Sequence, residues 1–215
     1  MTTFPRPLLY DCATAPSPRR ARILLAEKGV AHDTVQVDLR NGEQLTEAYR
    51  QINPLCTVPA LRTEEGALLT DNAAIAAYVE AHYPAPPLLG RTPLEKAEIA
   101  SWQWRVEFDG LMAVAEAFRN TSPAMAGRAL PGPVHHAQIP ALGERGLLRV
   151  QQFFEQLNAR LRGRDFIAGE GFSIVDITAV VVVDFARVVK LKPGDNLPEL
   201  LRWRAAMAQR PSMSV

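Results

Sequence analysis

The chain has 215 residues, of which 47% are apolar and 22% charged, so it is long enough and apolar enough to bury a substantial core. Its formal net charge of +1 excludes a global field that attracts nucleic acid or an anionic membrane. Two cysteines, Cys12 and Cys56, exclude a disulfide framework and favour a reducing compartment. The first residues lack the apolar core of a signal peptide, and no apolar run reaches the ~18 residues of a membrane span. We therefore expect a cytoplasmic protein with no nucleic-acid or membrane partner.

The first 83 residues alternate between strand-like and helix-like patterns. An apolar run at residues 8–10 predicts a strand, and helical spacing follows at residues 19–28. Alternation around Val35 and Val37 predicts a half-buried strand at residues 32–39. The remaining elements are a helix at 43–51, a hairpin formed by 58–62 and 67–69, and a helix at 72–82. The predicted order is βαβαββα, an α/β domain covering residues 1–83.

A proline-rich segment follows at residues 84–93, with four prolines in ten residues, and we interpret it as a linker. Only helical patterns lie beyond it, which predicts an all-α domain at residues 94–215. One apolar stripe runs from Ala97 through Trp104 and Phe108 to Phe118, and a second runs from Leu147 to Leu161. We expect the segment of residues 120–140 between them to be irregular and mobile.

Local signals conflict in residues 173–191. The run of β-branched residues favours a buried strand. Ser173 and Asp176 have the spacing of a capping box, which favours a helix that starts there. We predict a central helix, because a helix that is apolar nearly all round is a buried one.

Four motifs occur in register along the chain. They are Ser17-Pro-Arg-Arg-Ala-Arg, Thr57-Val-Pro-Ala-Leu, Asp71-Asn72 ahead of a helix, and Ser173-Ile-Val-Asp176. Together they closely resemble a cytosolic glutathione S-transferase of the bacterial type. The resemblance covers nearly the whole chain and implies a thioredoxin-like N-terminal domain, an all-helical C-terminal domain and a homodimer. It also implies that glutathione is the co-substrate and that no metal takes part.

The resemblance assigns the glutathione site to four residues. It implies that the Val58–Pro59 bond is cis and that the Val58 backbone pairs with the cysteinyl part of glutathione. Without the neighbouring motifs, Pro59 is an ordinary strand-opening proline. Asp71 and Asn72 stand where the family holds the γ-glutamyl group. Both residues also suit a helix N-cap, and the two roles are compatible.

The group that stabilises the glutathione thiolate is harder to assign. The position that several classes of the family use for this purpose corresponds to Ala15, which has no donor. Ser17 is the best remaining donor, with Cys12, Thr14 and Tyr10 in reserve, and the alternative for Ser17 is a plain N-cap just before a helix. Cys56 stands where some classes place a histidine for the glycine carboxylate. We expect it to be a buried small side chain, leaving Arg19, Arg20 or Arg40 as the cation.

The resemblance places the second substrate against the first C-terminal helix, where Trp104, Phe108 and Met112 are the apolar candidates. A core role is the alternative for each. His135 and His136 lack further ligands for a metal. We expect conjugation of the glutathione thiolate to an apolar electrophile, as in detoxification. Cys12 favours a thiol-disulfide or peroxide reductase instead, and Ala15 favours a non-catalytic glutathione-binding scaffold.

Overall fold

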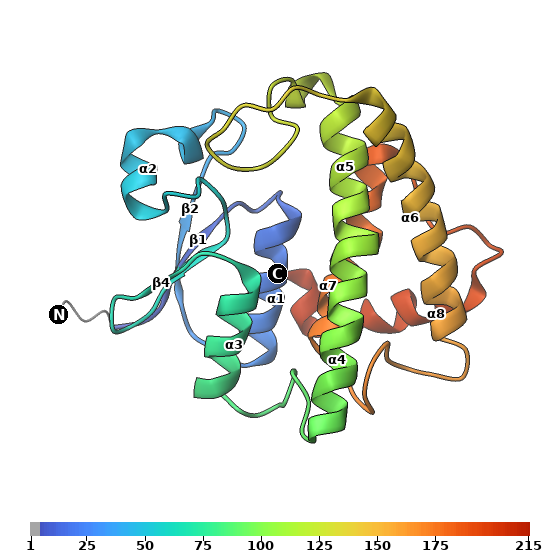
Figure 1. Ribbon diagram of the computed structural model, residues 1–215. Helices are drawn as coiled ribbons and strands as arrows, with labels where there is room; N and C mark the ends of the chain where they lie inside the picture. Colours follow the sequence, from blue (N-terminus) through green and yellow to red (C-terminus); the bar gives the residue numbers. More distant parts are fainter. Residues whose placement is uncertain (1–4) are drawn as a thin grey trace. The chain divides into compact units, whose positions relative to one another are not determined.

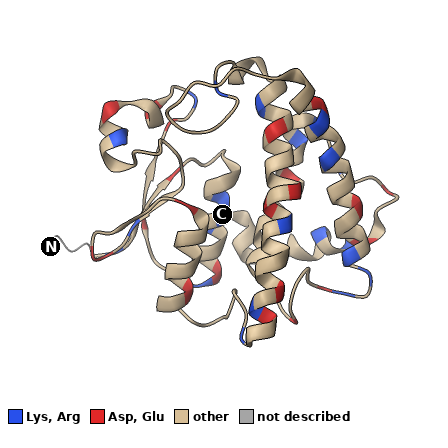
Figure 2. Ribbon diagram, in the orientation of Figure 1, with Lys and Arg blue, Asp and Glu red and all other residues tan. Residues whose placement is uncertain are grey.

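A computed structural model describes residues 5–215 of the chain. These residues form two compact units that divide between Pro86 and Pro87, with residues 131–134 and Val215 grouped with the first unit. Lys and Arg are interspersed with Asp and Glu along the helices, so neither sign dominates either unit (Figure 2).

The first unit is an α/β domain in the predicted order. Its strands are β1 (Leu8–Asp11), β2 (Asp33–Gln36), β3 (Ala60–Arg62) and β4 (Leu68–Leu69), and its helices are α1 (Pro16–Glu27), η1 (Glu43–Leu45), α2 (Glu47–Ile52) and α3 (Asn72–His82). The sheet order is β2-β1-β3-β4, with β1 parallel to β2 and antiparallel to β3. Helices α1 and α3 lie on one side of the sheet and α2 on the other (Figure 1). The predicted thioredoxin-like fold is confirmed.

Two details of this unit differ from the sequence prediction. Strand β2 is an edge strand with all four residues exposed, so Val35 is not half-buried. Val37, the other residue of the predicted pair, lies just beyond β2 and is buried in a cluster with Tyr10, Tyr49 and Ala60. The alternating pattern does not show that β2 lies at the edge of the sheet, where it pairs with β1 on one side only.

Lys28, the C-cap of α1, connects this helix to α3 and to the segment that follows α3. Its side chain is fully buried, and its Nζ lies 2.5 Å from the Glu80 carboxylate. The same Nζ donates to the carbonyl oxygens of Tyr83 (2.7 Å) and Pro86 (2.6 Å). All three ammonium protons therefore have acceptors, which a fully buried lysine requires.

The second unit is helical throughout the part that the structure describes. Its helices are α4 (Pro93–Arg105), the π-helical η2 (Val106–Leu111), α5 (Met112–Thr121), η3 (Pro123–Met125), α6 (Pro140–Arg160), α7 (Ile174–Phe185), η4 (Ala186–Val189), α8 (Pro198–Met207) and η5 (Pro211–Ser214). Every residue from Ile174 to Val183 is buried, so the prediction of a central helix there is confirmed. None of the described helices is both long and apolar enough to span a membrane.

The apolar stripe of residues 97–118 correctly predicted helical structure, which the chain forms as α4, η2 and α5, but its side chains do not make the core face. Trp104 is 64% exposed, whereas Val106, Ala113 and Ala117 are fully buried. The core face consists of small residues because α5 and α6 pack closely: a Cβ on Gly146 would lie 2.6 Å from the Ala117 backbone nitrogen. The π-helical turn of η2 also shifts the register, since it adds a residue to the turn.

Candidate glutathione site

Helix α1 begins three residues earlier than predicted, which changes the place of Ser17. The N-cap is Ala15, which offers no side-chain hydrogen bond, and Ser17 lies inside the first turn between Pro16 and Pro18. The prediction that Ser17 precedes the helix as its possible N-cap is therefore wrong. Proline fits the first turn because its φ is preset and its missing N–H is not needed there. Ser17 then carries the one backbone N–H among the first three helical residues, and no described residue accepts from it.

The Ser17 hydroxyl is held by two neighbours. Nδ2 of Asn72 lies 3.1 Å from Ser17 Oγ and 3.2 Å from the Ser17 carbonyl oxygen. The guanidinium of Arg20, which is only 7% exposed, donates to the same Oγ at 3.3 Å. Two of the predicted site residues, from the first turns of α1 and α3, are thus in direct contact.

The start of α3 is capped by Asp71. Its Oδ1 accepts from the Ala74 N–H at 2.8 Å, and its backbone is extended, as an N-cap requires. The capping role considered for this pair is therefore confirmed for Asp71, which is exposed and keeps its second carboxylate oxygen outside this bond. Asn72, the first helical residue, instead directs its amide to Ser17.

The segment that carries Val58 is held in place by Tyr49 of α2 and by Asn53, the C-cap of that helix. The Val58–Pro59 bond is cis, the isomer that the resemblance implied. Tyr49 Oη and Asn53 Nδ2 both donate to the Thr57 carbonyl oxygen at 2.8 Å. Burial raises the pKa of Tyr49 to about 12, so its phenol stays protonated as a donor. No described residue pairs with the Val58 N–H or C=O, which leaves both groups available for a peptide-like ligand.

A buried network that the sequence did not reveal holds the β1–α1 loop. Asp11, 2% exposed, pairs with Arg22 and accepts from Gln36 Nε2 at 2.6 Å. Arg22 also donates to the Ala13 carbonyl at 3.1 Å, and the Ala13 N–H donates to Gln36 Oε1 at 3.0 Å. The loop that leads to Ser17 is therefore fastened from α1 and from β2. Its partners are 11 and 25 residues from Asp11, beyond the reach of local motifs.

The reserve residues have different surroundings. Tyr10 lies in the core cluster with its ring edge-on to Tyr49, at 6.1 Å between centroids. Cys12 is half-buried, with its Sγ 3.6 Å from Thr14 Oγ1. Cys56 is buried as expected, and its φ of 54° is the left-handed conformation that favours glycine. Of these, Cys12 and Thr14 keep side chains outside the core.

The residues predicted for the second substrate lie on an exposed face of the helical unit. Trp104 and Phe108 stack at 5.2 Å, and Met112, like Phe108, is 48% exposed. The guanidinium of Arg149, from α6, lies 4.8 Å above the Phe108 ring. The three residues thus form an exposed apolar strip along α4, η2 and α5 and are not part of the core.

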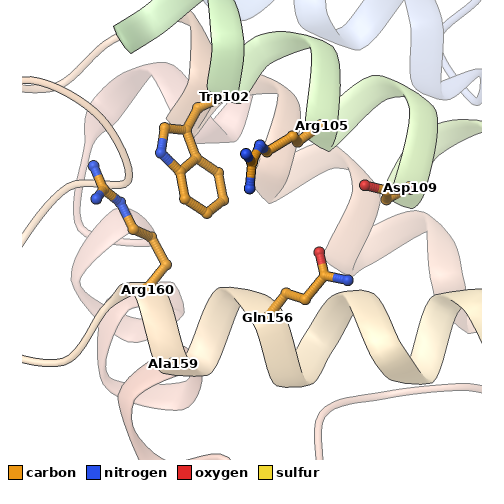
Figure 3. A pocket seen from close by; sticks show the side chains of 6 residues that line it. All are labelled: Trp102, Arg105, Asp109, Gln156, Ala159 and Arg160. Atoms are coloured by element: carbon orange, nitrogen blue, oxygen red, sulfur yellow. The ribbon is translucent and has the colours of Figure 1, made fainter.

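The helical unit also contains a pocket of about 450 Å³ between α4–η2 and α6. Figure 3 shows Trp102 with Arg105 on one side and Arg160 on the other, the two guanidinium carbons lying 5.2 and 4.8 Å from the ring. Asp109, Gln156 and Ala159 complete the lining. None of the residues predicted for the second substrate lines it.

No group of three potential metal ligands occurs within residues 5–215. The two histidines considered for a metal lie in the segment between α5 and α6. His136 donates its backbone N–H to the Gly127 carbonyl at 2.9 Å and forms an isolated bridge with Arg128. Apart from this bridge and η3, residues 122–139 contain no helix or strand, so the predicted irregular connection is confirmed.

Known proteins resemble the chain over nearly its whole length. Residues 14–82 match the model of the glutathione S-transferase N-terminal domain, and residues 134–211 match that of the C-terminal domain. Glutathione S-transferase 2 of Saccharomyces cerevisiae is 33% identical over 96% of this chain and 87% of its own. A glutathione S-transferase domain-containing protein of Marinobacter aquaeolei VT8 is 35% identical, with a TM-score of 0.85 over 96% of this chain and 99% of its own. The crystal structure of Gtt2 from Saccharomyces cerevisiae superposes with a TM-score of 0.87 at 33% identity, covering 96% and 98% of the two chains.

Proposed function

The chain belongs to the glutathione S-transferase family, and on this premise we propose that it binds glutathione, ionises its thiol and adds the thiolate to an apolar electrophile. We assign the glutathione site to a thioredoxin-like domain at residues 1–83, joined by a linker at residues 84–93 to a helical domain at residues 94–215. In the reaction the thiol proton leaves to solvent and the sulfur forms a bond to an electrophilic carbon. Either the bond from that carbon to a leaving group breaks and the group departs with the electron pair, or a π bond of that carbon breaks and the neighbouring atom takes up a proton from solvent.

The peptide part of glutathione has three groups that suit the start of α3 and the Val58 segment. The Val58 N–H and C=O, which no residue from 5 to 215 pairs with, support strand-like pairing with the cysteinyl residue of glutathione beside Pro59. The exposed carboxylate of Asp71 suits the γ-glutamyl ammonium. Asn72 Oδ1 remains as an acceptor for the same ammonium, because its Nδ2 is already bound to Ser17.

The position of the Ser17 hydroxyl at the start of α1 is the main support for the catalytic part of the proposal. A thiol with a pKa near 8.5 is only a few per cent ionised at pH 7, so the site must favour the thiolate. Ser17 offers an O–H and an N–H at the start of a helix of twelve residues, where the dipole also favours negative charge. Both donors come from one residue, since Pro16 and Pro18 have no N–H.

The second substrate, the assembly and the location belong to the same proposal. Trp104, Phe108 and Met112 give an exposed apolar strip that suits an electrophile without charge. We propose a homodimer in the cytoplasm that detoxifies such compounds, without metal.

Ser17→Ala tests this function. We expect the pKa of bound glutathione to rise and turnover at neutral pH to fall, with a smaller change in glutathione affinity. The loss should be below the about 3 kcal/mol of a preorganised donor, because water partly replaces it. The measurement is the thiolate absorbance of bound glutathione against pH. Thr14→Ala, which removes an exposed hydroxyl from the preceding loop, is the control, and an equal shift in both variants contradicts the role of Ser17.

Two alternatives each rest on one residue. The half-buried thiol of Cys12, at the end of β1, favours a glutathione-dependent disulfide or peroxide reductase. Ala15 at the N-cap of α1 favours a scaffold that binds glutathione without catalysis. A conjugation assay with an aromatic electrophile, run beside a disulfide-reduction assay, separates the three. Wild-type protein that binds glutathione with an ordinary thiol pKa supports the scaffold.

A further inference from the structure

The hydrogen-bond directions around Ser17 Oγ are fixed by chemistry. The guanidinium of Arg20 contains N–H donors and no acceptor atom, so it can only donate to Ser17 Oγ. The Asn72 amide lies 3.2 Å from the Ser17 carbonyl oxygen, which can only accept. The atom at that position must therefore be Nδ2, and the same Nδ2 donates to Oγ at 3.1 Å.

A serine hydroxyl has two lone pairs and one proton. Asn72 and Arg20 occupy both lone pairs, so the proton must point away from both residues. We propose that Asn72 and Arg20 are positioning residues that aim the Ser17 O–H at the glutathione sulfur. This role rests on the proposed function and deepens it, because it gives the Asn72 amide a task other than holding the γ-glutamyl group.

The positive charge of Arg20 supports the same role for the Ser17 hydroxyl. Arg20 is almost completely buried, so its positive charge acts through a medium of lower dielectric than water. A hydroxyl that accepts from a cation becomes a stronger donor, since hydrogen bonds in a chain polarise one another. Arg20 thus assists the thiolate through Ser17, which is a different task from meeting the glycine carboxylate.

Asn72→Asp tests the proposal with almost no change of shape. The new carboxylate cannot donate to Ser17 Oγ and instead accepts its proton, which turns the O–H inward. We expect the pKa of bound glutathione to rise by at least as much as in Ser17→Ala, each unit being a tenfold loss of thiolate well below the pKa. The readout is again the thiolate absorbance against pH, with glutathione affinity measured on the same samples.

The added charge needs its own control. In the Ser17→Ala background, Asn72→Asp has no hydroxyl to redirect, so the remaining shift measures the charge alone. We expect the shift to be clearly smaller there than in wild type. Equal shifts in the two backgrounds would overturn the positioning role, whereas an unchanged pKa in Ser17→Ala itself would overturn the proposed function of Ser17.

Two further variants keep the test decisive if Asn72→Asp does not fold. Asn72→Ala removes the donor without adding charge, and it should raise the thiol pKa only when Ser17 is present. Arg20→Lys keeps the charge and one donor, and it should retain more of the thiolate than Arg20→Met. An Asn72→Ala variant with the wild-type titration would refute the proposal.

Discussion

The starts of α7 and α1 differ in what happens to the N–H groups that have no acceptor within the helix. At α7 these groups are paired with side chains, and at α1 the corresponding group of Ser17 is not. At α7, Ser173 Oγ accepts from the Val175 N–H, and the Asp176 carboxylate accepts from the Ser173 N–H at 3.1 Å. Asp176 also accepts from the Ile167 N–H and from Trp203 Nε1, each at 3.1 Å. At α1, the N-cap Ala15 makes no side-chain hydrogen bond, and no residue between 5 and 215 accepts from the Ser17 N–H.

Under the proposed function, the difference separates a helix start that stabilises the fold from one that binds glutathione. A helix start inside the core must pair every donor, because an unpaired one costs about 1–3 kcal/mol. A helix start that receives an anion must leave donors unpaired until the anion arrives. Changes at α7 should therefore alter folding and spare glutathione, whereas changes at α1 should do the reverse.

Asp176→Ala should give the largest effect. It leaves the Ile167, Ser173 and Trp203 N–H groups without their acceptor in the core, and relief of the buried charge offsets only part of this. We expect a loss of about 3 kcal/mol or more in the free energy of unfolding, measured with urea at pH 7. Glutathione affinity of the folded fraction should stay at the wild-type value.

Ser173→Ala is the graded control for that variant. It removes one capping oxygen and keeps the carboxylate, so we expect a loss of about 1 kcal/mol. Unchanged urea midpoints in both variants would show that the box does not stabilise the fold.

The pH dependence of folding sharpens the same point. Burial raises the pKa of Asp176 from 3.8 to about 6, against the four hydrogen bonds that lower it. Between these values the folded chain binds the proton that the unfolded chain has released, so this carboxyl favours folding most below pH 3.8. The advantage is lost as pH rises through 6, by about 3 kcal/mol at most. Unfolding of wild type and Asp176→Asn should be compared from pH 4 to 7, and a difference that moves the other way would mean a lowered pKa.

Ala15→Asp should give the smallest change in stability. It should stabilise the fold and at the same time disfavour the thiolate of bound glutathione. A carboxylate at this N-cap can accept from the Ser17 N–H, which should stabilise the free protein by about 0.5–1 kcal/mol. The same bond and charge should raise the pKa of bound glutathione. Thermal unfolding and the thiolate titration check the two effects. Ala13→Asp adds equal charge to an exposed site in the same loop, and an identical response would rule out capping as the cause.

The starts of α3, α7 and α1 show how far helix bounds could be predicted from the sequence. Residues 72–82 were predicted with both bounds correct because Asp71 is a true N-cap with a side-chain acceptor. The capping box likewise located α7 against a strong β-branched preference. The start of α1 was missed because Pro-Ser-Pro resembles a turn followed by a cap, whereas both prolines lie inside the first turn.

Long-range packing was outside the reach of the sequence. The apolar pattern of residues 97–118 indicated the large side chains, but the contact between α5 and α6 is made by small ones, such as Ala117 and Gly146. The fully buried Trp203 donates its Nε1–H to Asp176, which lies 27 residues away along the chain. The contact between Ser17 and Asn72 was also hidden, because the two residues are 55 positions apart along the chain.

The contacts of Lys28 have a consequence for any attempt to isolate the thioredoxin-like unit. Its buried ammonium needs the Pro86 carbonyl as well as Glu80 and Tyr83. A chain truncated at Tyr83 would leave one proton of a buried cation without an acceptor, and it would loosen the end of the helix whose first turn carries Ser17. Proteolysis within residues 84–86 should be equally damaging, whereas a cut after Pro86 keeps all three acceptors. The shortest N-terminal fragment that keeps all three acceptors of Lys28 therefore ends at Pro86.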